Sequence, residues 1–343
     1  HMNSKLQNPL QKMLNDREWI LADGATGTNL FNMGLSSGNA PEMWNRTEPK
    51  KIKALYQNSV DAGSDLFLTN SFGGNRSRLN LHGVANDAAA FSQLSAEIGR
   101  EVADLCSRLV IVAGSVGPTG EIMEPIGKLS YQTAVEIFHE QAESLKKGGV
   151  DVVWVETISD ASELKAAAEA FSLADIEWCS TMSFDTAGRT MFGITALDFV
   201  KLISEIPNKP LAIGANCGVG ASDVLRTILS ISSSKTNLPI IAKGNAGIPK
   251  YHHGKIHYDG TPELMSLYAT LARDCGAKII GGCCGTTPHH LRAMHQALLR
   301  HTKTEPPSLN TIKEAVGEFS SISDGTDSAY PARERRNRRR HIR

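Results

Sequence analysis

The sequence predicts a parallel (β/α)8 barrel, the TIM-barrel fold, and two observations support this prediction. Eight short apolar runs alternate with eight helical patterns over about 300 residues, and the runs read as strands that are buried on both faces. A polar side chain also lies near the end of each run, and in this fold the active site gathers where the strands end. A doubly wound parallel sheet is the alternative fold.

The expected strands are apolar and rich in β-branched residues, and each is followed by a helical pattern. The strands are expected at 19–25, 65–72, 109–117, 150–157, 177–184, 211–218, 239–247 and 277–285. The helices are expected at 49–62, 87–108, 131–148, 161–172, 197–206, 222–234, 261–275 and 288–301. In chain order, the strands end near Asp23, Asn70, Ser115, Glu156, Ser183, Asn216, Lys243 and Cys283. Together these elements predict one barrel domain over residues 1–303.

The composition changes after the barrel, in the extension 304–343. Residues 304–332 are rich in Ser, Pro, Thr and Asp, with one short helical pattern near 312–319, so we expect disorder apart from that pattern. Residues 333–343 hold seven Arg and one Glu, and because the whole chain is formally neutral, residues 1–332 carry a charge of −6. The basic end suits nucleic acid, an anionic membrane or an acidic neighbouring subunit. A nucleic-acid function is disfavoured because no aromatic side chain follows Tyr330.

The chain has the composition of a cytoplasmic enzyme. No apolar run is long enough to span a membrane, and the polar N-terminus, which begins like a tag remnant, has no signal-peptide profile. Six cysteines in 343 residues, two of them adjacent, do not form a disulfide framework. We therefore expect reduced thiols, which a metal site requires.

Three of these cysteines form the strongest functional signal. Cys217 ends one apolar run and the adjacent Cys283 and Cys284 end another, and glycines surround both places. Three thiolates suit a tetrahedral Zn²⁺ with one open position, which indicates catalysis, whereas a structural zinc normally has four protein ligands. Neighbouring residues of a strand point to opposite faces, so Cys283 and Cys284 reach one metal only if the chain leaves the strand there. The nearby glycines permit that departure.

The other three cysteines, Cys106, Cys179 and Cys275, are expected to be buried apolar residues. None of them has glycine on both sides or a polar cluster beside it.

Five motifs, taken in order, resemble the homocysteine S-methyltransferase family over roughly residues 15–300. They are Asp23-Gly24-Ala25-Thr26-Gly27-Thr28, Leu68-Thr69-Asn70-Ser71-Phe72, Glu156-Thr157, Asn216-Cys217-Gly218 and Gly281-Gly282-Cys283-Cys284-Gly285. Within the family, Pro41-Glu42-Met43-Trp44-Asn45 and the single catalytic module look most like bacterial betaine–homocysteine methyltransferases. The resemblance implies a zinc barrel that moves a methyl group onto the sulfur of homocysteine, giving methionine. The expected small-molecule partners are homocysteine and a methyl donor, and family analogy also implies a homo-oligomer.

This chemistry assigns roles to the residues at the strand ends. Zinc holds the substrate thiol as the reactive thiolate, and Cys217, Cys283 and Cys284 are the expected ligands. Glu156 is the expected partner of the substrate ammonium, and the resemblance implies the same role. The backbone N–H groups of the loop Asp23, Gly24, Ala25, Thr26 and Gly27 are an expected anion site for the substrate carboxylate. Asp23 and Glu156 complete the expected catalytic set, and Asn70 is a further expected contact.

The donor is less well specified. Glycine betaine is the leading donor, and its quaternary ammonium binds aromatic faces by cation–π attraction, for which Trp44, Phe72 and Tyr258 are the candidates. A sulfonium donor, S-methylmethionine or dimethylsulfoniopropionate, needs the same kind of cage. A methylcorrinoid donor requires a separate protein. A non-catalytic zinc-stabilised binding protein is the remote alternative.

The loop after the seventh expected strand holds His252, His253, His257 and Tyr258. A second metal site is one hypothesis, but the adjacent histidines lack the helical spacing of a metal pair. We favour a polar loop that shapes the donor pocket or a subunit contact. Lys243 and Asn245 are expected pocket residues without an assigned role.

Overall fold

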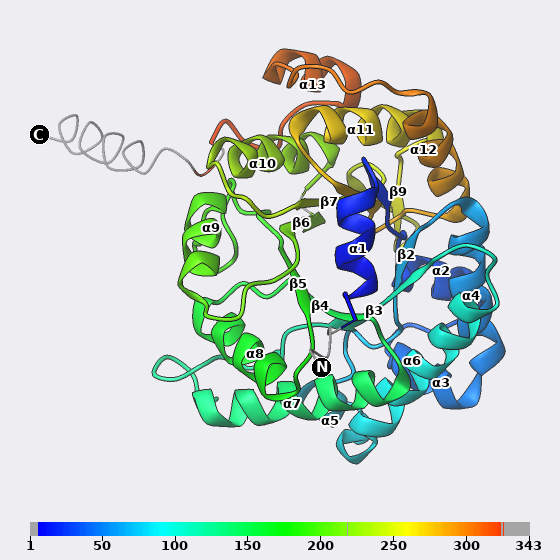
Figure 1. Ribbon diagram of the computed structural model, residues 1–343, viewed down its shortest axis with the longest axis vertical. Coiled ribbons are helices and arrows are strands. Elements are labelled where there is room, and N and C mark those ends of the chain that lie inside the picture. Colours follow the sequence, from blue (N-terminus) through cyan, green and yellow to red (C-terminus); the bar gives the residue numbers. More distant parts are fainter. Residues whose placement is uncertain (1–5, 218, 324, 326–343) are drawn as a thin grey trace, which may run out of the picture.

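The computed structural model describes residues 6–217, 219–323 and 325. Its main sheet has eight parallel strands in the order β1-β10-β7-β6-β5-β4-β3-β2, curved into a barrel with helices outside (Figure 1). The strands are β1 (Ile20–Leu21), β2 (Leu66–Leu68), β3 (Ile111–Val116), β4 (Val152–Glu156), β5 (Trp178–Met182), β6 (Ile213–Cys217), β7 (Ile240–Gly244) and β10 (Ile279–Gly282). Each lies inside an expected run, so the barrel prediction is confirmed.

Eight helices match the expected pattern to within a few residues at each end. They are α4 (Pro49–Ala62), α6 (Ala88–Asp104), α7 (Tyr131–Gly148), α8 (Ala161–Leu173), α9 (Ala196–Glu205), α10 (Ala221–Ser233), α11 (Pro262–Cys275) and α12 (Pro288–Arg300). Several short elements were not predicted: α1 (Pro9–Asp16), α2 (Thr26–Asn32), η1 (Pro41–Met43), α3 (Trp44–Thr47), α5 (Arg76–Asn80) and η2 (Ala85–Asp87). Most of these additions lie in the connections after β1 and β2.

The sheet closes between β1 and β2 through side chains as well as backbone. The N–H of Asp65 donates to the carbonyl of Leu21 at 2.7 Å, and the N–H of Leu21 donates to the Asp65 carboxylate at 3.0 Å. At the C-terminal end of β2, the N–H of Leu68 donates to Asp23 Oδ2 at 3.0 Å. Asp23 therefore replaces a ladder hydrogen bond at the top of the barrel, which fixes its carboxylate.

The barrel interior is filled by alternate side chains of the strands, among them Ile20, Leu66, Ile111, Trp154 and Ile241. Helix α1 places Leu10, Met13 and Leu14 against these residues and closes the N-terminal end of the barrel (Figure 1). Because this end is plugged, the polar strand ends at the opposite face form the accessible side of the interior.

The extension after the barrel is ordered for much of its described length. The expected short helix lies at α13 (Leu309–Val316), three residues earlier than predicted, and it packs on α10 and α11. Arg226 of α10 donates to the carbonyls of Ser321 and Ser323 at 3.1 and 3.2 Å and stacks on Phe319. Beyond the expected helix, the structure differs from the expected disorder at residues 320–323, because Asp223 and Arg226 of α10 hold them on the barrel. The Arg-rich end lies outside the described residues.

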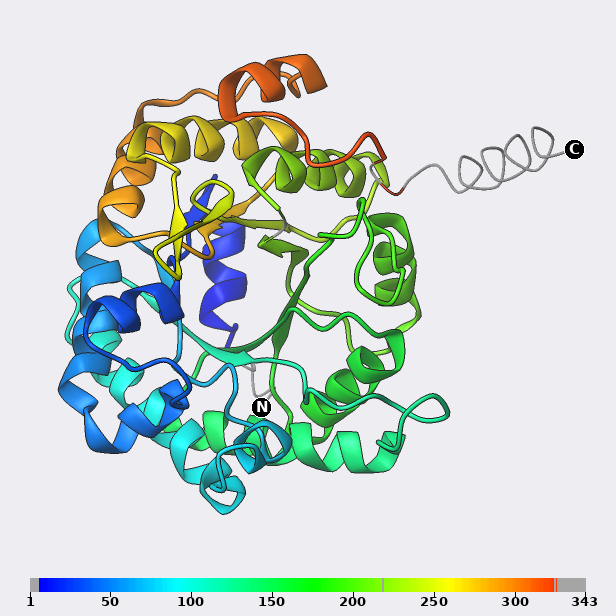
Figure 2. The same ribbon diagram turned by 180° about the vertical axis from the view of Figure 1, so that it is seen from behind.

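The loop with the histidines forms a two-stranded antiparallel hairpin, β8 (Pro249–His252) and β9 (Lys255–Tyr258), on the face opposite α1 (Figure 2). Its residues are exposed except Tyr258, and the rings of His252 and His257 lie 5.9 Å apart. Within the described part of the chain, these histidines do not join a group of three metal-binding side chains.

None of the described helices combines the length and apolar composition needed to cross a bilayer.

Candidate metal and substrate site

The three predicted metal ligands meet at the C-terminal face of the barrel. Cys217 ends β6, and Cys283 and Cys284 follow β10 two strands away, with β7 between them. Their sulfur atoms lie within 4.8 Å of one another, and Cys217 Sγ is 2.8 Å from Cys283 Sγ. Among the described residues this is the one group of three or more His, Cys, Asp or Glu side chains that could hold a metal.

Cys283 and Cys284 reach the same point because the strand ends at Gly282. The chain then turns, with the N–H of Thr286 donating to the carbonyl of Cys283 and Gly285 at φ +78°. A side chain at Gly282 would lie 2.2 Å from Thr286 Oγ1, and one at Gly285 would lie 2.4 Å from Tyr258 Cβ. The expected departure from the strand is confirmed, and these two glycines make it possible.

Two residues beside the cysteine group have left-handed backbone conformations that side chains rarely adopt. Cys217 has φ 56° and Thr157, after β4, has φ 68°. Asn216 connects them, since its Nδ2 donates to Thr157 Oγ1 at 3.0 Å and lies 3.4 Å from Cys217 Sγ, while its Oδ1 accepts from Thr181 at 2.8 Å. Backbone strain of this kind clusters at functional sites. The network fixes the direction in which Cys217 points.

The three thiols perturb one another's ionisation. Hydrogen bonds from Cys217 and Cys283 lower the pKa of Cys284 to about 3, whereas the hydrogen bonds of Cys283 with Cys217 and Cys284 raise the pKa of Cys283. For Cys217, the hydrogen bond with Cys283 acts to lower the pKa, but the contact with Cys284 and burial outweigh it and raise the pKa to about 12. Ionisation of one thiol thus disfavours ionisation of its neighbours.

The donor set fits a soft, tetrahedral metal ion. Three thiolates bound at about 2.3 Å in a tetrahedron lie roughly 3.8 Å apart, so metal binding needs Cys217 and Cys283 to separate by about 1 Å from their 2.8 Å contact. A divalent cation supplies the positive charge that would let all three thiols ionise.

Glu156 lies at the end of β4 and is the open carboxylate of the site. Ser115 Oγ donates to its Oε1 at 3.2 Å, and we find no second donor to this carboxylate among the described residues. Burial raises the pKa of Glu156 to about 7, against the opposing effect of the Lys243 ammonium. This carboxylate therefore has unused acceptor capacity.

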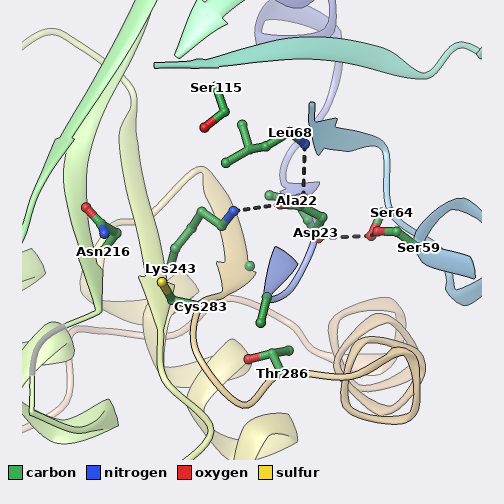
Figure 3. Close-up of polar contacts among 12 residues, drawn as sticks. Ala22, Asp23, Ser59, Ser64, Leu68, Ser115, Asn216, Lys243, Cys283 and Thr286 are labelled. Atoms are coloured by element: carbon green, nitrogen blue, oxygen red, sulfur yellow. Dashed lines mark hydrogen bonds and ion pairs between the residues drawn. The ribbon is translucent and has the colours of Figure 1, made fainter. Parts of the chain in front are cut away.

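Asp23 is already paired. Its Oδ1 lies 2.6 Å from Lys243 Nζ of β7 and its Oδ2 accepts from Leu68, and both side chains are almost completely buried (Figure 3). Figure 3 also shows the Lys243 side chain extending past Cys283 toward Asp23. The lysine ammonium thus lies between the metal site and the first strand.

The loop after Asp23 packs against the loop that carries the cysteines. The N–H of Ala25 donates to the Thr286 carbonyl, the N–H of Gly285 donates to Thr28 Oγ1, and a side chain at Gly24 would lie 2.6 Å from the Thr286 carbonyl oxygen. Helix α2 begins at Thr26, so the N–H groups of Thr26 and Gly27 have no partners within the helix. The expected anion site thus lies next to the cysteine loop.

The expected aromatic residues do not form one cluster. Tyr258 packs on Gly285, and its hydroxyl hydrogen-bonds with Cys284. Burial is the main cause of the raised pKa of Tyr258, and the charge of Cys284 and this hydrogen bond add to it. The half-buried Phe72 packs against Gly117. Trp44 packs in the outer layer between α3 and α4, with Lys51 Nζ 4.5 Å from its ring centre. Tyr258 therefore lies at the site, whereas one face of Trp44 already holds a cation of this chain.

Asn70 is buried, and its amide group binds the chain itself. Its Nδ2 donates to the Pro41 carbonyl at 2.8 Å and to Asn45 Oδ1 at 2.9 Å, which holds the 41–45 segment on the barrel. Cys179 and Cys275 are buried, as predicted, whereas Cys106, which was also expected to be buried, is half-buried in apolar surroundings.

Sequence reasoning missed several parts of the site. Lys243 was an expected pocket residue without a role, and its pairing with Asp23 joins positions 220 residues apart, which no local pattern reveals. The Thr157 strain and the Asn216 contacts are also invisible in the sequence. The Ser115 contact with Glu156 follows from the β3–β4 pairing, because both residues end neighbouring strands.

Comparisons with known proteins agree with this geometry. The family model for homocysteine S-methyltransferase matches residues 20–298. The methionine synthase of Mycobacterium tuberculosis is 29% identical over 318 residues, and that of Mycobacterium leprae is 30% identical over 297 residues. These alignments cover 87% and 82% of this chain, but the chain spans only 26% and 24% of the relatives.

A solved structure with the same fold is the homocysteine methyltransferase MmuM from Escherichia coli. Its metallated form superposes with a TM-score of 0.72 at 22% identity, covering 84% of this chain and 99% of MmuM, and its oxidized form gives a TM-score of 0.70. The superposition supports the barrel fold, and the family model covers most of the chain, including both cysteine segments. The chain belongs to the homocysteine S-methyltransferase family.

Proposed function

We propose that this chain transfers a methyl group from glycine betaine to the sulfur of homocysteine, giving methionine and dimethylglycine. The observation that carries the proposal is the convergence of Cys217, Cys283 and Cys284 beside the open carboxylate of Glu156. A thiol-activating group and an ammonium-binding group thus share one mouth of the barrel. The family that the chain belongs to supports the same acceptor.

The three cysteines hold Zn²⁺ in this proposal. When bound, zinc supplies the positive charge that keeps the sulfur of homocysteine a thiolate at neutral pH, where a free thiol with a pKa near 8.5 is mostly protonated. Three soft thiolate ligands leave the metal electron-rich, so the bound sulfur stays nucleophilic. The fourth position is open to substrate because three cysteines, not four, share this place.

The protein orients the acceptor by its amino-acid end. Glu156 binds the ammonium, which offsets the cost of burying this carboxylate. The N–H groups at the start of α2 face the carboxylate, and Asp23 fixes the position of that loop. The substrate sulfur then points toward the cysteines.

The methyl transfer itself is a direct displacement. The thiolate of homocysteine forms a bond to a methyl carbon of betaine, the carbon–nitrogen bond breaks, and the electron pair stays on the nitrogen of dimethylglycine. No proton or oxidant is consumed. The chain's part in this step is to hold the two substrates in line and to exclude water.

Aromatic faces are the expected partners of the quaternary ammonium. Tyr258 is the best placed of the three candidates, since it lies against Gly285 beside Cys284. Phe72 and Trp44 belong to the segments after β2 and β1 and remain candidates for the outer wall of the donor pocket.

A homo-oligomer is part of the same proposal and is tested by the mass of the protein in solution.

The decisive experiment is mass-spectrometric detection of methionine from homocysteine and glycine betaine, with zinc-loaded protein under reducing conditions. Equal amounts of methionine and dimethylglycine support the proposal. If no methionine forms but homocysteine still changes the X-ray absorption edge of the metal, homocysteine is the acceptor and betaine is not the donor. S-methylmethionine, dimethylsulfoniopropionate and a methylcorrinoid protein are then tested in turn as donors. A metal edge that does not respond to homocysteine contradicts the acceptor as well, and favours a non-catalytic zinc-stabilised protein.

A further inference from the structure

Lys243 has an ammonium group with spare hydrogen-bonding capacity. The residue is 2% exposed, and Asp23 Oδ1 is the one acceptor of its three N–H bonds among the described residues. A buried ammonium usually requires several partners, because its desolvation costs several kcal/mol. The nearest aromatic face, that of Trp154, has its ring centre 5.9 Å from Nζ. This lysine is therefore charged and incompletely satisfied.

Glu156 shows the opposite deficiency in the same space. It is a half-buried carboxylate with one neutral donor, Ser115, and its charge and that of Lys243 act on each other. The buried Asp23, by contrast, uses both oxygens, one for Lys243 and one for the Leu68 N–H. Of these two carboxylates, Glu156 alone has room for an incoming ammonium.

We propose that Lys243 binds the carboxylate of the acceptor, opposite Glu156, and that Asp23 is a positioning residue that holds Lys243 instead of binding the substrate. The inference rests on the proposed function, because it takes an α-amino acid with a thiol as the acceptor. It adds a specificity determinant: the site selects a substrate with both charges of a zwitterion.

Three observations support this arrangement. First, Lys243 near the end of β7 and Glu156 at the end of β4 each have one hydrogen-bond partner among the described residues. A zwitterionic substrate would supply a carboxylate to Lys243 and an ammonium to Glu156. Second, Lys243 donates to Asp23 at the end of the first strand, so its remaining N–H groups lie on the β1 side of the site, across the barrel mouth from Glu156 on β4. Third, Trp154 Nε1 is a fully buried donor without a partner among the described residues, on the ring that Lys243 faces.

The test uses two substrate analogues that each lack one charge. 3-Aminopropane-1-thiol is homocysteine without its carboxylate, and 4-sulfanylbutanoate is homocysteine without its ammonium. Binding of all three thiols to zinc-loaded protein is measured by titration calorimetry. The variants are Lys243→Met, Glu156→Gln and the double variant Asp23→Asn/Lys243→Met, in which a neutral pair replaces the buried ion pair and keeps the site foldable.

The wild-type protein should bind homocysteine more tightly than either analogue. Lys243→Met should weaken binding of homocysteine and of 4-sulfanylbutanoate roughly ten- to hundredfold, and that of 3-aminopropane-1-thiol less than about threefold. Glu156→Gln should show the reverse selectivity. The double variant Asp23→Asn/Lys243→Met should show the same selectivity as Lys243→Met. Asp23→Asn, measured as a further single variant, should resemble Lys243→Met but with a smaller loss, because the lysine remains and is only less well held. Lys250→Met, at an exposed lysine of the hairpin, is the matched control and should change nothing.

Other results would overturn the inference. Equal weakening of all three thiols in the double variant would mean that the ion pair is merely structural. Tighter binding of homocysteine and of the aminothiol would mean that Lys243 competes with the substrate ammonium for the carboxylates. If wild-type protein binds none of the thiols, the proposed function itself is contradicted, and the inference falls with it.

Discussion

Glu163 should make the stability of the barrel fall as the pH rises. It lies in the first turn of α8, is 6% exposed and accepts a hydrogen bond from the Thr119 N–H at 2.8 Å. Burial, with the charges of Asp160 and Glu121, outweighs that hydrogen bond and raises its pKa from 4.5 to about 7. A raised pKa in the folded state means that the folded protein binds more protons than the unfolded chain between these values. Stability is therefore lost as the pH rises from 4.5 to 7.

The magnitude follows from the size of the shift. Each pKa unit corresponds to 1.36 kcal/mol, so ionised Glu163 costs about 3 kcal/mol above pH 7 and nothing below pH 4.5. Glu163→Gln keeps an acceptor for Thr119 but cannot ionise. The variant should match the wild type at pH 4 and exceed it by up to about 3 kcal/mol at pH 8.

Urea denaturation at constant zinc, repeated from pH 4 to pH 8, measures the difference in the free energy of unfolding. Glu205→Gln, at an exposed position of α9, is the control and should give a difference that does not change with pH. A difference between Glu163→Gln and wild type that stays constant across pH 4.5–7 would refute the reasoning.

Three further predictions concern the metal, the donor and the extension. Cys217→Ala should lose bound zinc and methyl transfer, measured by metal analysis and methionine formation, whereas Cys106→Ala should keep both; normal metal content in Cys217→Ala would exclude it as a ligand. Trp44→Ala should raise the KM for the methyl donor and leave the Kd for homocysteine unchanged, and an unaltered donor KM would remove Trp44 from the donor pocket. Arg226→Met should cost about 2 kcal/mol of stability, because it removes charged hydrogen bonds to Ser321 and Ser323, and should expose residues 317–323 to limited proteolysis. Unchanged proteolysis would show that the contacts of α13, Ser222 and Asp223 hold the extension without Arg226.

The barrel was predictable because its elements are long and periodic. Eight apolar runs and eight helices repeat one local pattern, and burial of each strand on both faces leaves a strong signal in the sequence. The short elements left no such signal. Helix α2 begins in the glycine-bearing loop after β1 and α5 has only five residues, so tertiary contacts rather than propensity decide them. The segment after α13 is held by Ser222, Asp223 and Arg226 of α10, nearly a hundred residues earlier.

The metal ligands could be predicted for a different reason. Three cysteines beside glycines at strand ends are chemically distinctive, and the turn after Gly282 follows from the need for two adjacent residues to face one point. The charge arrangement around the substrate could not be predicted in this way. Asp23 reads in the sequence as a free carboxylate at a strand end, but the barrel places it between the Leu68 N–H and the Lys243 ammonium, which leaves Glu156 as the open acid. Which of the two carboxylates keeps a free oxygen thus depends on how many of its oxygens the fold has already used.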